Sequence, residues 1–385
     1  MRILSRLVAV PAFAAAALAA AGLAAAGPAL ASPHRTHGLR PDGARHVVFV
    51  QTDNTAGNAV AAYHRAPDGT LTPAGTYATG GKGGVLSGSV VDHTASQGAL
   101  AYDQARGLLI AVNPGSNTVA VFQVQGDRLA LSQVLWSGGD FPVSVTVSGD
   151  HAYVLNAFGG GSLYGYRIAG GRLAPIPGSN RGLHLGTTAA SAFTATPGQV
   201  AFTPDGSQLL VTTKASTNDV DVFSVGPDGR LSESPAVNSL PADVPFAVAF
   251  DQAGHVVLAE AGPNAVATFT LSGGGQLTGN AVADTGQKAT CWVVRDGQYL
   301  YASNAGSGSV SGYSVGWSGG LTALGNTTTA AGTVDAAAAE GQFLYVRTGA
   351  AGLVDEFSVG AGGALTSIGS VTVPGGAGGE GIAAA

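Results

Sequence analysis

A unit of four short strands recurs along this chain with a period of about 45 residues, and such a repeat limits the possible folds more than any other feature. One unit has strands at residues 200–202, 208–212 and 219–225, and the next has them at 247–250, 255–259 and 265–271. Turns such as Pro204-Asp205-Gly206 separate them, and no helical period follows the N-terminal segment. We therefore predict an all-β fold, a single seven-bladed β-propeller of four-stranded blades.

The two ends of the repeat region offer strands for one shared blade. Residues 46–50 read as a second strand, whereas residues 381–385 read as a first strand. If both belong to one blade, the ring closes and no strand is left with an unpaired inner edge. We predict this shared blade, and the alternative is that the glycine-rich end frays.

The N-terminal segment has the pattern of an export signal. Arg2 and Arg6 precede an apolar run over residues 7–23, and small residues end at Ala29-Leu30-Ala31. We predict a signal peptide over residues 1–31, a flexible tether over 32–45 and the propeller over 46–385. No second apolar run reaches the ~18 residues that a membrane-spanning helix needs. We therefore expect a secreted, extracellular protein without membrane insertion.

Composition narrows the classes of partner. Charged residues make up 10% of the chain and the formal net charge is −6, which argues against nucleic acid as a partner. The single cysteine, Cys291, has no partner for an intramolecular disulfide, and we predict a buried, inert thiol. Spacings typical of zinc sites and cofactor motifs are missing, so we predict no metal and no cofactor. We also expect a monomer. Calcium bound through Asp140, Asp243 and Asp335 stays a weaker alternative, because no calcium-loop spacing supports it.

Several blade phrases resemble those of a known family. They are Phe202-Thr203-Pro204-Asp205-Gly206, Asp221-Val222-Phe223-Ser224-Val225 and Pro227-Asp228-Gly229-Arg230-Leu231. They resemble the lactonase-like propellers, a group that includes 6-phosphogluconolactonase-like and carboxymuconate-lactonising enzymes and the broader YVTN-type repeats. The resemblance implies a reaction that opens or closes a small sugar or aromatic lactone. The family's Arg-His pair and its Glu correspond here to Gly198, Gln199 and Lys214, so its catalytic residues do not carry over.

The placement of any site follows from propeller geometry, because ligands sit over the central channel on the face formed by two sets of loops. These loops join outer strands to the next inner strands, and second strands to third strands. Two of them, residues 79–98 and 176–197, are unusually long for a compact repeat. They supply our candidate catalytic residues, His93, Arg181 and His184, an imidazole with a guanidinium for a lactone or carboxylate. Further ligand-binding candidates on this face are Asp92, Asp140, Lys214, Asp243, Glu260 and Lys288.

Three functional classes remain open. The first is a lactonase-like enzyme, the second a non-catalytic extracellular propeller that binds a glycan, peptide or protein, and the third an envelope-associated repeat protein. A deep pocket where His93, Arg181 and His184 converge would favour the enzyme, whereas a plugged, apolar channel would favour a scaffold. Gly316-Trp317-Ser318-Gly319-Gly320 matches a nucleophile-elbow spacing, but it lies between two strands, so we predict an ordinary hairpin turn.

Overall fold

The computed structural model describes residues 46–385. The predicted signal peptide and the predicted tether lie outside the described residues and stay predictions. Among the described residues, no helix is long and apolar enough to cross a membrane.

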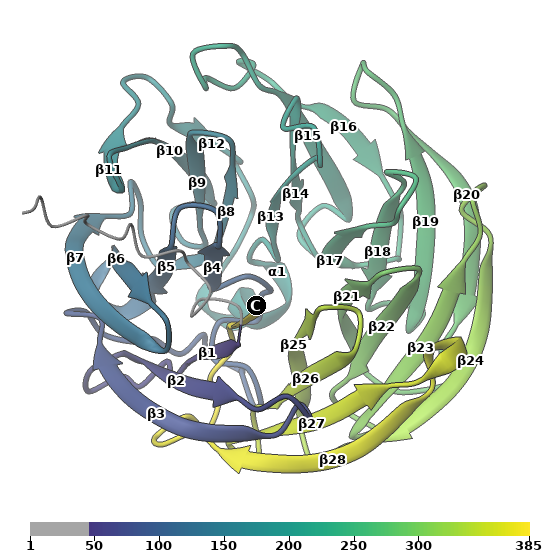
Figure 1. The fold of residues 1–385 in the computed structure, drawn as a ribbon. Helices are drawn as coiled ribbons and strands as arrows, with labels where there is room; N and C mark the ends of the chain where they lie inside the picture. Colours follow the sequence, from purple (N-terminus) through teal and green to yellow (C-terminus); the bar gives the residue numbers. More distant parts are fainter. Residues whose placement is uncertain (1–45) are drawn as a thin grey trace, which may run out of the picture. The chain divides into compact units, whose positions relative to one another are not determined.

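Seven antiparallel sheets form the described chain and stand around a common axis, as Figure 1 shows, which confirms the predicted propeller. Blade 1 consists of β29 (Ile382–Ala384), β1 (Val47–Gln51), β2 (Ala59–Arg65) and β3 (Leu71–Ala78). Blade 2 consists of β4 (Leu100–Asp103), β5 (Leu108–Asn113), β6 (Thr118–Gln125) and β7 (Arg128–Trp136). Blade 3 consists of β8 (Pro142–Ser148), β9 (His151–Asn156), β10 (Ser162–Ala169) and β11 (Arg172–Pro175), with β12 (Arg181–Gly182) as an added strand on β10.

The other four blades are regular. Blade 4 consists of β13 (Val200–Phe202), β14 (Gln208–Thr212), β15 (Asp219–Ser224) and β16 (Ala236–Ser239). Blade 5 consists of β17 (Pro245–Phe250), β18 (Val256–Glu260), β19 (Ala265–Leu271) and β20 (Leu277–Asp284). Blade 6 consists of β21 (Thr290–Asp296), β22 (Tyr299–Asn304), β23 (Ser309–Val315) and β24 (Leu321–Thr328). Blade 7 consists of β25 (Thr333–Ala339), β26 (Phe343–Thr348), β27 (Leu353–Val359) and β28 (Leu365–Thr372).

The predicted shared blade is present. Strand β29 is the inner strand of blade 1 and pairs with β1, where Phe49 lies opposite Ala383. The Ala385 N–H donates to the Val47 carbonyl at 3.0 Å, and the Arg65 Nη2 donates to the Ala385 carbonyl at 3.0 Å. These bonds join the two ends of the described chain and close the ring without a covalent link.

Tyrosines on second strands tie neighbouring blades together in a repeated way. The hydroxyl of Tyr153 donates to the carbonyl of Gly229 at 2.7 Å, and that of Tyr301 donates to Gly363 at 2.9 Å. In each case the acceptor is a glycine in the turn between the third and fourth strands of the following blade. Gly363 has a φ of +78°, and a Cβ there would stand 2.7 Å from the ring of Tyr299. The glycine-rich turns therefore serve packing between blades as well as chain reversal.

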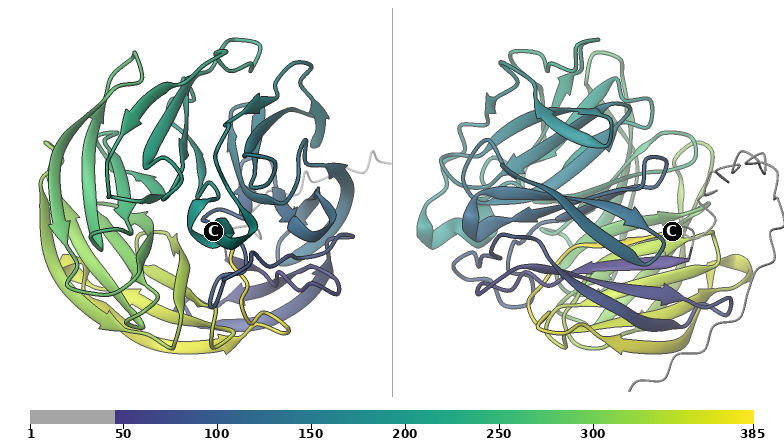
Figure 2. Two further views of the ribbon diagram at one scale, coloured as in Figure 1. Left: turned by 180° about the vertical axis from the view of Figure 1, so that it is seen from behind. Right: turned by 60° about the vertical axis from the view of Figure 1, so that its left-hand side comes forward.

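Short helical segments were not part of the sequence-based prediction. The helix α1 (Ala192–Ala195) follows a 3-10 turn (Ala189–Ser191) inside the second long loop, and two further 3-10 turns are Pro114–Ser116 and Ala361–Gly363. Thr188 and Ser191 bond reciprocally to each other's backbone N–H, which satisfies donors at the start of the turn. A single helical turn is too short to leave a period in the sequence. Figure 2 shows α1 near the middle of the ring.

Candidate functional site

The central channel is crossed at one end by residues 94–98, which we call the plug segment. They belong to the first long loop, which joins β3 to β4 on the face where outer strands connect to the next inner strands; we call this the upper face. The carbonyl of Gln97 accepts from the Ser144 Oγ at 2.7 Å in blade 3. On another side of the ring, its side-chain amide bonds to the backbone of Val293 in blade 6, with N···O distances of 3.0 Å in both directions. The plug segment therefore spans the channel from blade to blade.

Trp292 fixes the plug segment from blade 6. Its indole Nε1 donates to the Ser96 carbonyl at 2.7 Å, and the residue is only 4% exposed. The Ser96 hydroxyl in turn donates to the Val143 carbonyl in blade 3 at 2.8 Å. Buried bonds of this kind are costly to leave unmade, so each holds the segment in place.

Lys214 joins both long loops to blade 4. It lies two residues after the end of β14, is 1% exposed, and its Nζ donates to the carbonyls of Ala95 at 2.7 Å and Phe193 at 3.0 Å. A third bond of 3.0 Å goes to the Thr196 hydroxyl, so one ammonium serves the plug segment and the second long loop. The Nζ also stands 5.3 Å from the centre of the Phe246 ring, within range for a cation–π interaction.

Burial controls the charge of Lys214. The pKa of its ammonium is lowered to about 7 because burial disfavours the charged form, and the negative charge of Asp92 opposes this effect. The Asp92 carboxylate accepts from the N–H and hydroxyl of Thr94 and from the N–H of Ser96, each at 2.9 Å. Asp92 thus shapes the turn that enters the plug segment, and burial raises its own pKa despite these bonds.

Further acids surround the plug segment. The carboxyls of Asp335 and Glu380 share a hydrogen bond, and burial raises the pKa of Asp335 to about 6 and that of Glu380 well above its ordinary value. The bond lowers the pKa of Asp335 and raises that of Glu380. The carboxyl of Glu380 also accepts from the Gly98 N–H at 2.8 Å. This channel end is therefore plugged but polar. It is neither the deep pocket expected of an enzyme nor the plugged, apolar channel expected of a scaffold.

Gly198 and Gln199, which stand at the positions of the family's catalytic pair, both have structural roles. A Cβ at Gly198 would stand 2.7 Å from the Phe246 carbonyl oxygen and 2.8 Å from the Thr212 hydroxyl, so no larger side chain fits there. The Gln199 amide bonds to the backbone of Val248, accepting from its N–H at 2.6 Å and donating to its carbonyl at 3.1 Å. An Arg-His pair in this place would have to displace both arrangements.

Two of the candidate catalytic residues, His93 and Arg181, bond to other parts of the chain. The His93 N–H donates to the Gly378 carbonyl at 2.8 Å, and its ring lies against that glycine. Arg181 lies on β12, and its guanidinium donates to the carbonyls of Leu231 at 2.6 Å and Ser232 at 2.8 Å in blade 4. Within residues 46–385, no hydrogen bond links His93 to Arg181 or to the exposed His184. A catalytic role for these three residues stays a prediction.

The remaining candidates are spread over the upper face. Asp140 is exposed and accepts from the Asn117 side chain at 2.7 Å, whereas the Lys288 side chain is open to solvent. Glu260 is buried at the end of β18, and burial, followed by the nearby charge of Asp243, raises its pKa to about 7. Asp92 and Lys214 are the only ones of our ligand-binding candidates that lie at the plug segment. Ligand binding by any of the six stays a prediction.

The remaining candidates for chemistry are a metal site and the thiol of Cys291. In the part of the chain that the structure describes, no three His, Cys, Asp or Glu side chains are grouped so that they could hold a metal ion. Burial raises the pKa of the Cys291 thiol to about 12, so the thiolate is scarce at neutral pH. Residues 316–320 form a hairpin turn closed by the bond from the Gly316 N–H to the Gly320 carbonyl at 2.9 Å.

Sequence reasoning missed several residues of this region. Gln97 and Ser96 hold the plug segment, and Trp292 receives it, but polar loop residues and a lone tryptophan carry no pattern that points to a channel. Arg347 was missed too: its buried guanidinium donates to the carbonyls of Leu353 at 3.2 Å and of Gly376. An arginine inside a second strand, where apolar residues are the rule, was the available signal.

Comparison with known proteins supports the fold. No family model matches the chain, and no curated protein matches its sequence. Among solved structures, a periplasmic gluconolactonase of Pseudomonas aeruginosa has a TM-score of 0.70 at 18% identity, covering 88% of this chain and 98% of that one. Candidate 6-phosphogluconolactonases from Bacteroides fragilis and Bacteroides uniformis have TM-scores of 0.67 and 0.68 at 20% and 19% identity. They cover 86% and 85% of this chain, and each is itself covered to 96%. The predicted resemblance to lactonase-like propellers is thus confirmed for the fold.

Proposed function

We propose that this chain is an exported β-propeller of lactonase-like fold that binds a ligand outside the cytoplasm and does not turn over lactones. The observation that carries the proposal is the closure of the upper channel end by the plug segment. Lys214 of blade 4 and Trp292 of blade 6 hold that segment through buried hydrogen bonds, and its own Gln97 bonds to the backbone of Val293 in blade 6. A substrate would have to break several of these bonds before it reached the channel.

The chemistry of the closed end supports the same conclusion. Lactone opening needs a proton acceptor or donor near neutral pH and a donor for the developing oxyanion, both within reach of the substrate. Here the acids at the plug segment, Asp92, Asp335 and Glu380, are at most 4% exposed. The ammonium of Lys214 already donates to three oxygens. These groups stabilise the loops and leave no free donor for a ligand.

The proposal of export is based on the sequence of residues 1–31, and it agrees with the cellular location given for one structural relative. The charged start, apolar run and small-residue end of this segment follow the pattern of a secretory signal. The gluconolactonase of Pseudomonas aeruginosa is described as periplasmic. Mass spectrometry of the exported protein should find a mature start near Ser32, and a chain that retains Met1 would contradict export by cleavage.

A panel of lactones tests the lack of turnover. Glucono-δ-lactone, 6-phosphogluconolactone and an aromatic-acid lactone are incubated with the mature protein, with and without added divalent metal ions. We expect each to disappear at its spontaneous rate, while circular dichroism shows that the protein is folded β-sheet. Saturable hydrolysis of any of them would contradict the proposal.

Lactone hydrolysis on the upper face is the second candidate. It is favoured by the descriptions of the structural relatives and by His184, which is exposed three residues after Arg181. If it occurs, His184→Ala and Arg181→Ala should each lower kcat/KM by roughly a hundredfold. Ser318→Ala, in a turn on the opposite face, should stay within about twofold. Full activity in both loop variants would remove this candidate.

A further inference from the structure

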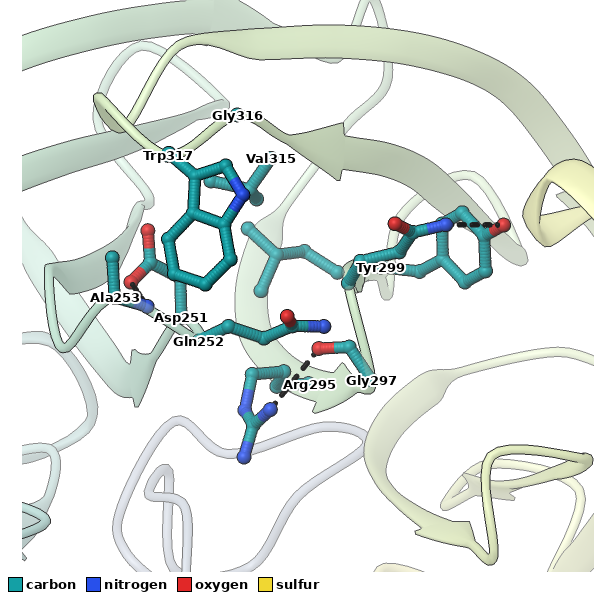
Figure 3. Close-up of a pocket in the computed structure, with 11 residues that line it drawn as sticks. Asp251, Gln252, Ala253, Arg295, Gly297, Tyr299, Val315, Gly316 and Trp317 are labelled. Atoms are coloured by element: carbon teal, nitrogen blue, oxygen red, sulfur yellow. Dashed lines mark hydrogen bonds between the residues drawn. The ribbon is translucent and has the colours of Figure 1, made fainter.

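Three turns of blades 5 and 6 enclose a hollow on the face opposite the plug segment, which we call the lower face. They are the turn after β17, the turn after β21 and the hairpin turn of residues 316–320. Figure 3 shows the indole of Trp317 on one side of the hollow, with Gln252 and Arg295 near it. None of these residues takes part in closing the channel.

Trp317 has no packing reason to be tryptophan. It is 79% exposed at the tip of a hairpin whose backbone is satisfied by its own bonds, Gly316 to Gly320 and Gly319 to Gly316, both 2.9 Å. By contrast, Trp292 is buried, and Trp136 packs its ring 5.5 Å from that of Tyr164. An exposed indole presents a large apolar face with a polar N–H at its edge, a combination that is enriched at binding interfaces.

Some polar side chains of the hollow are bonded within the protein, and others are exposed to solvent. The Asp251 carboxylate is used internally, because it accepts from the His255 ring at 2.7 Å and from two backbone N–H groups, which makes the floor rigid. Arg295 donates one N–H to the Gly297 carbonyl at 3.0 Å, and the guanidinium is otherwise exposed. The exposed Gln252 amide has no hydrogen bond within the described residues. A flat indole thus stands beside available donors and an amide acceptor.

The hollow continues in both directions along the lower face. On one side it shares Asp251, Arg295 and Trp317 with a second hollow that reaches Pro204 of blade 4, and a third begins at Pro204 and Gly254. On the other side it shares Tyr299 and Gly316 with a hollow that reaches Gly362 of blade 7. We call this row of neighbouring shallow hollows along the turns of four blades the lower groove; its length suits an extended chain better than a single small molecule.

We propose that the lower groove binds an extended carbohydrate chain, with one sugar ring stacked on Trp317 and its hydroxyls bonded to Arg295 and Gln252. The C–H face of a pyranose is apolar and packs flat on an indole, while its rim of hydroxyls needs donors and acceptors at the sides. The lower groove offers this combination around Trp317. The inference rests on the binding role proposed above and names its ligand class.

A peptide fits this groove less well. Extended peptides bind mainly by adding a strand to a free sheet edge or by filling apolar pockets at alternate positions. The walls here are turns whose backbone groups already bond to one another, as in the bond from the Asp251 N–H to the His255 carbonyl at 3.1 Å. The groove therefore offers side-chain donors and one aromatic platform, which is the chemistry of sugar recognition.

Tryptophan fluorescence and calorimetric titration with hexasaccharides test the proposal. The probes are cellohexaose, xylohexaose, chitohexaose and hexagalacturonate, titrated into wild-type protein and into Trp317→Ala, with Trp136→Ala as the control for an exposed tryptophan elsewhere. We expect at least one probe to bind, Trp317→Ala to weaken it by at least about tenfold, and Trp136→Ala to change it by less than about twofold. Arg295→Gln should weaken hexagalacturonate more than the neutral sugars if the carboxylate is recognised, and all alike if only hydroxyls are.

The failures of the two proposals can be told apart. Absence of binding for all four sugars, or binding that Trp317→Ala leaves unchanged, would overturn the carbohydrate site without bearing on lactone turnover. Trp317-dependent binding of unfolded casein peptides, with no sugar bound, would overturn it in favour of a peptide. Lactone hydrolysis alongside Trp317-dependent sugar binding would leave this site standing and refute the non-catalytic role.

Discussion

Replacing Lys214 with methionine removes two opposing contributions to stability at the plug segment. One is the hydrogen bonds of the ammonium, and the other is the cost of burying its charge. The lost bonds to Ala95, Phe193 and Thr196 come from a charged donor, and at ~1.5–3 kcal/mol each they amount to roughly 5–9 kcal/mol. Against this, burial lowers the pKa of the ammonium from 10.5 to about 7, so the buried charge carries a desolvation cost of the same order as its bonds, and methionine avoids that cost. The global free energy of unfolding should therefore change by only about a few kcal/mol, much less than the lost bonds alone would give.

The local effect should be larger than the global one, because the plug segment loses its bond to blade 4. Hydrogen exchange followed by mass spectrometry should show peptides covering residues 94–98 and 192–196 exchanging at least about tenfold faster in Lys214→Met. The exposed Lys288→Met serves as control and should leave them unchanged. Unchanged exchange in Lys214→Met would refute the view that this ammonium holds the two loops, as would equal acceleration in every blade.

Two further outcomes follow from the structure. Removal of residues 381–385 takes away β29 and its pairing with β1, so the midpoint of thermal unfolding should fall by several degrees; an unchanged midpoint would argue against ring closure by this strand. The pKa of Glu260 is raised from 4.5 to about 7, so the fold favours its protonated form. The stability from this group is therefore present below pH 4.5 and is lost as the pH rises through 7. Between pH 5 and pH 8 the free energy of unfolding of wild type should fall by roughly 1–2 kcal/mol more than that of Glu260→Gln, after allowance for screening; parallel pH profiles of the two proteins would show that Glu260 is not the cause.

The fold was predictable because its signals are local and repeated. Turns such as Pro204-Asp205-Gly206 and the alternating third strands occur once per blade, so errors at one unit are corrected by the next. The shared blade was predictable from incomplete units at the two ends of the repeat region, residues 46–50 and 381–385. Helix α1 was not, because four residues leave no helical period.

The channel end was predictable only in outline. The length of the first long loop indicated a special role, and Asp92 and Lys214 were placed on the correct face. The loop is held in the channel by bonds across the ring, such as the one from Trp292 to Ser96. These two residues are 196 positions apart in the sequence. No short pattern encodes such a pair, and the same limit left the partners of Arg181 in blade 4 unforeseen.

The most direct test of the closed channel is the exchange of the three tryptophan indole protons, observed by NMR after transfer into D2O. Trp136 and Trp317 are 60% and 79% exposed, whereas the Trp292 Nε1–H is buried in its bond to the Ser96 carbonyl. We predict that two indole signals vanish within minutes, that one persists for hours, and that Trp292→Phe removes the persistent signal. Loss of all three signals within minutes would show that the plug segment opens readily, and would contradict a channel closed to substrates.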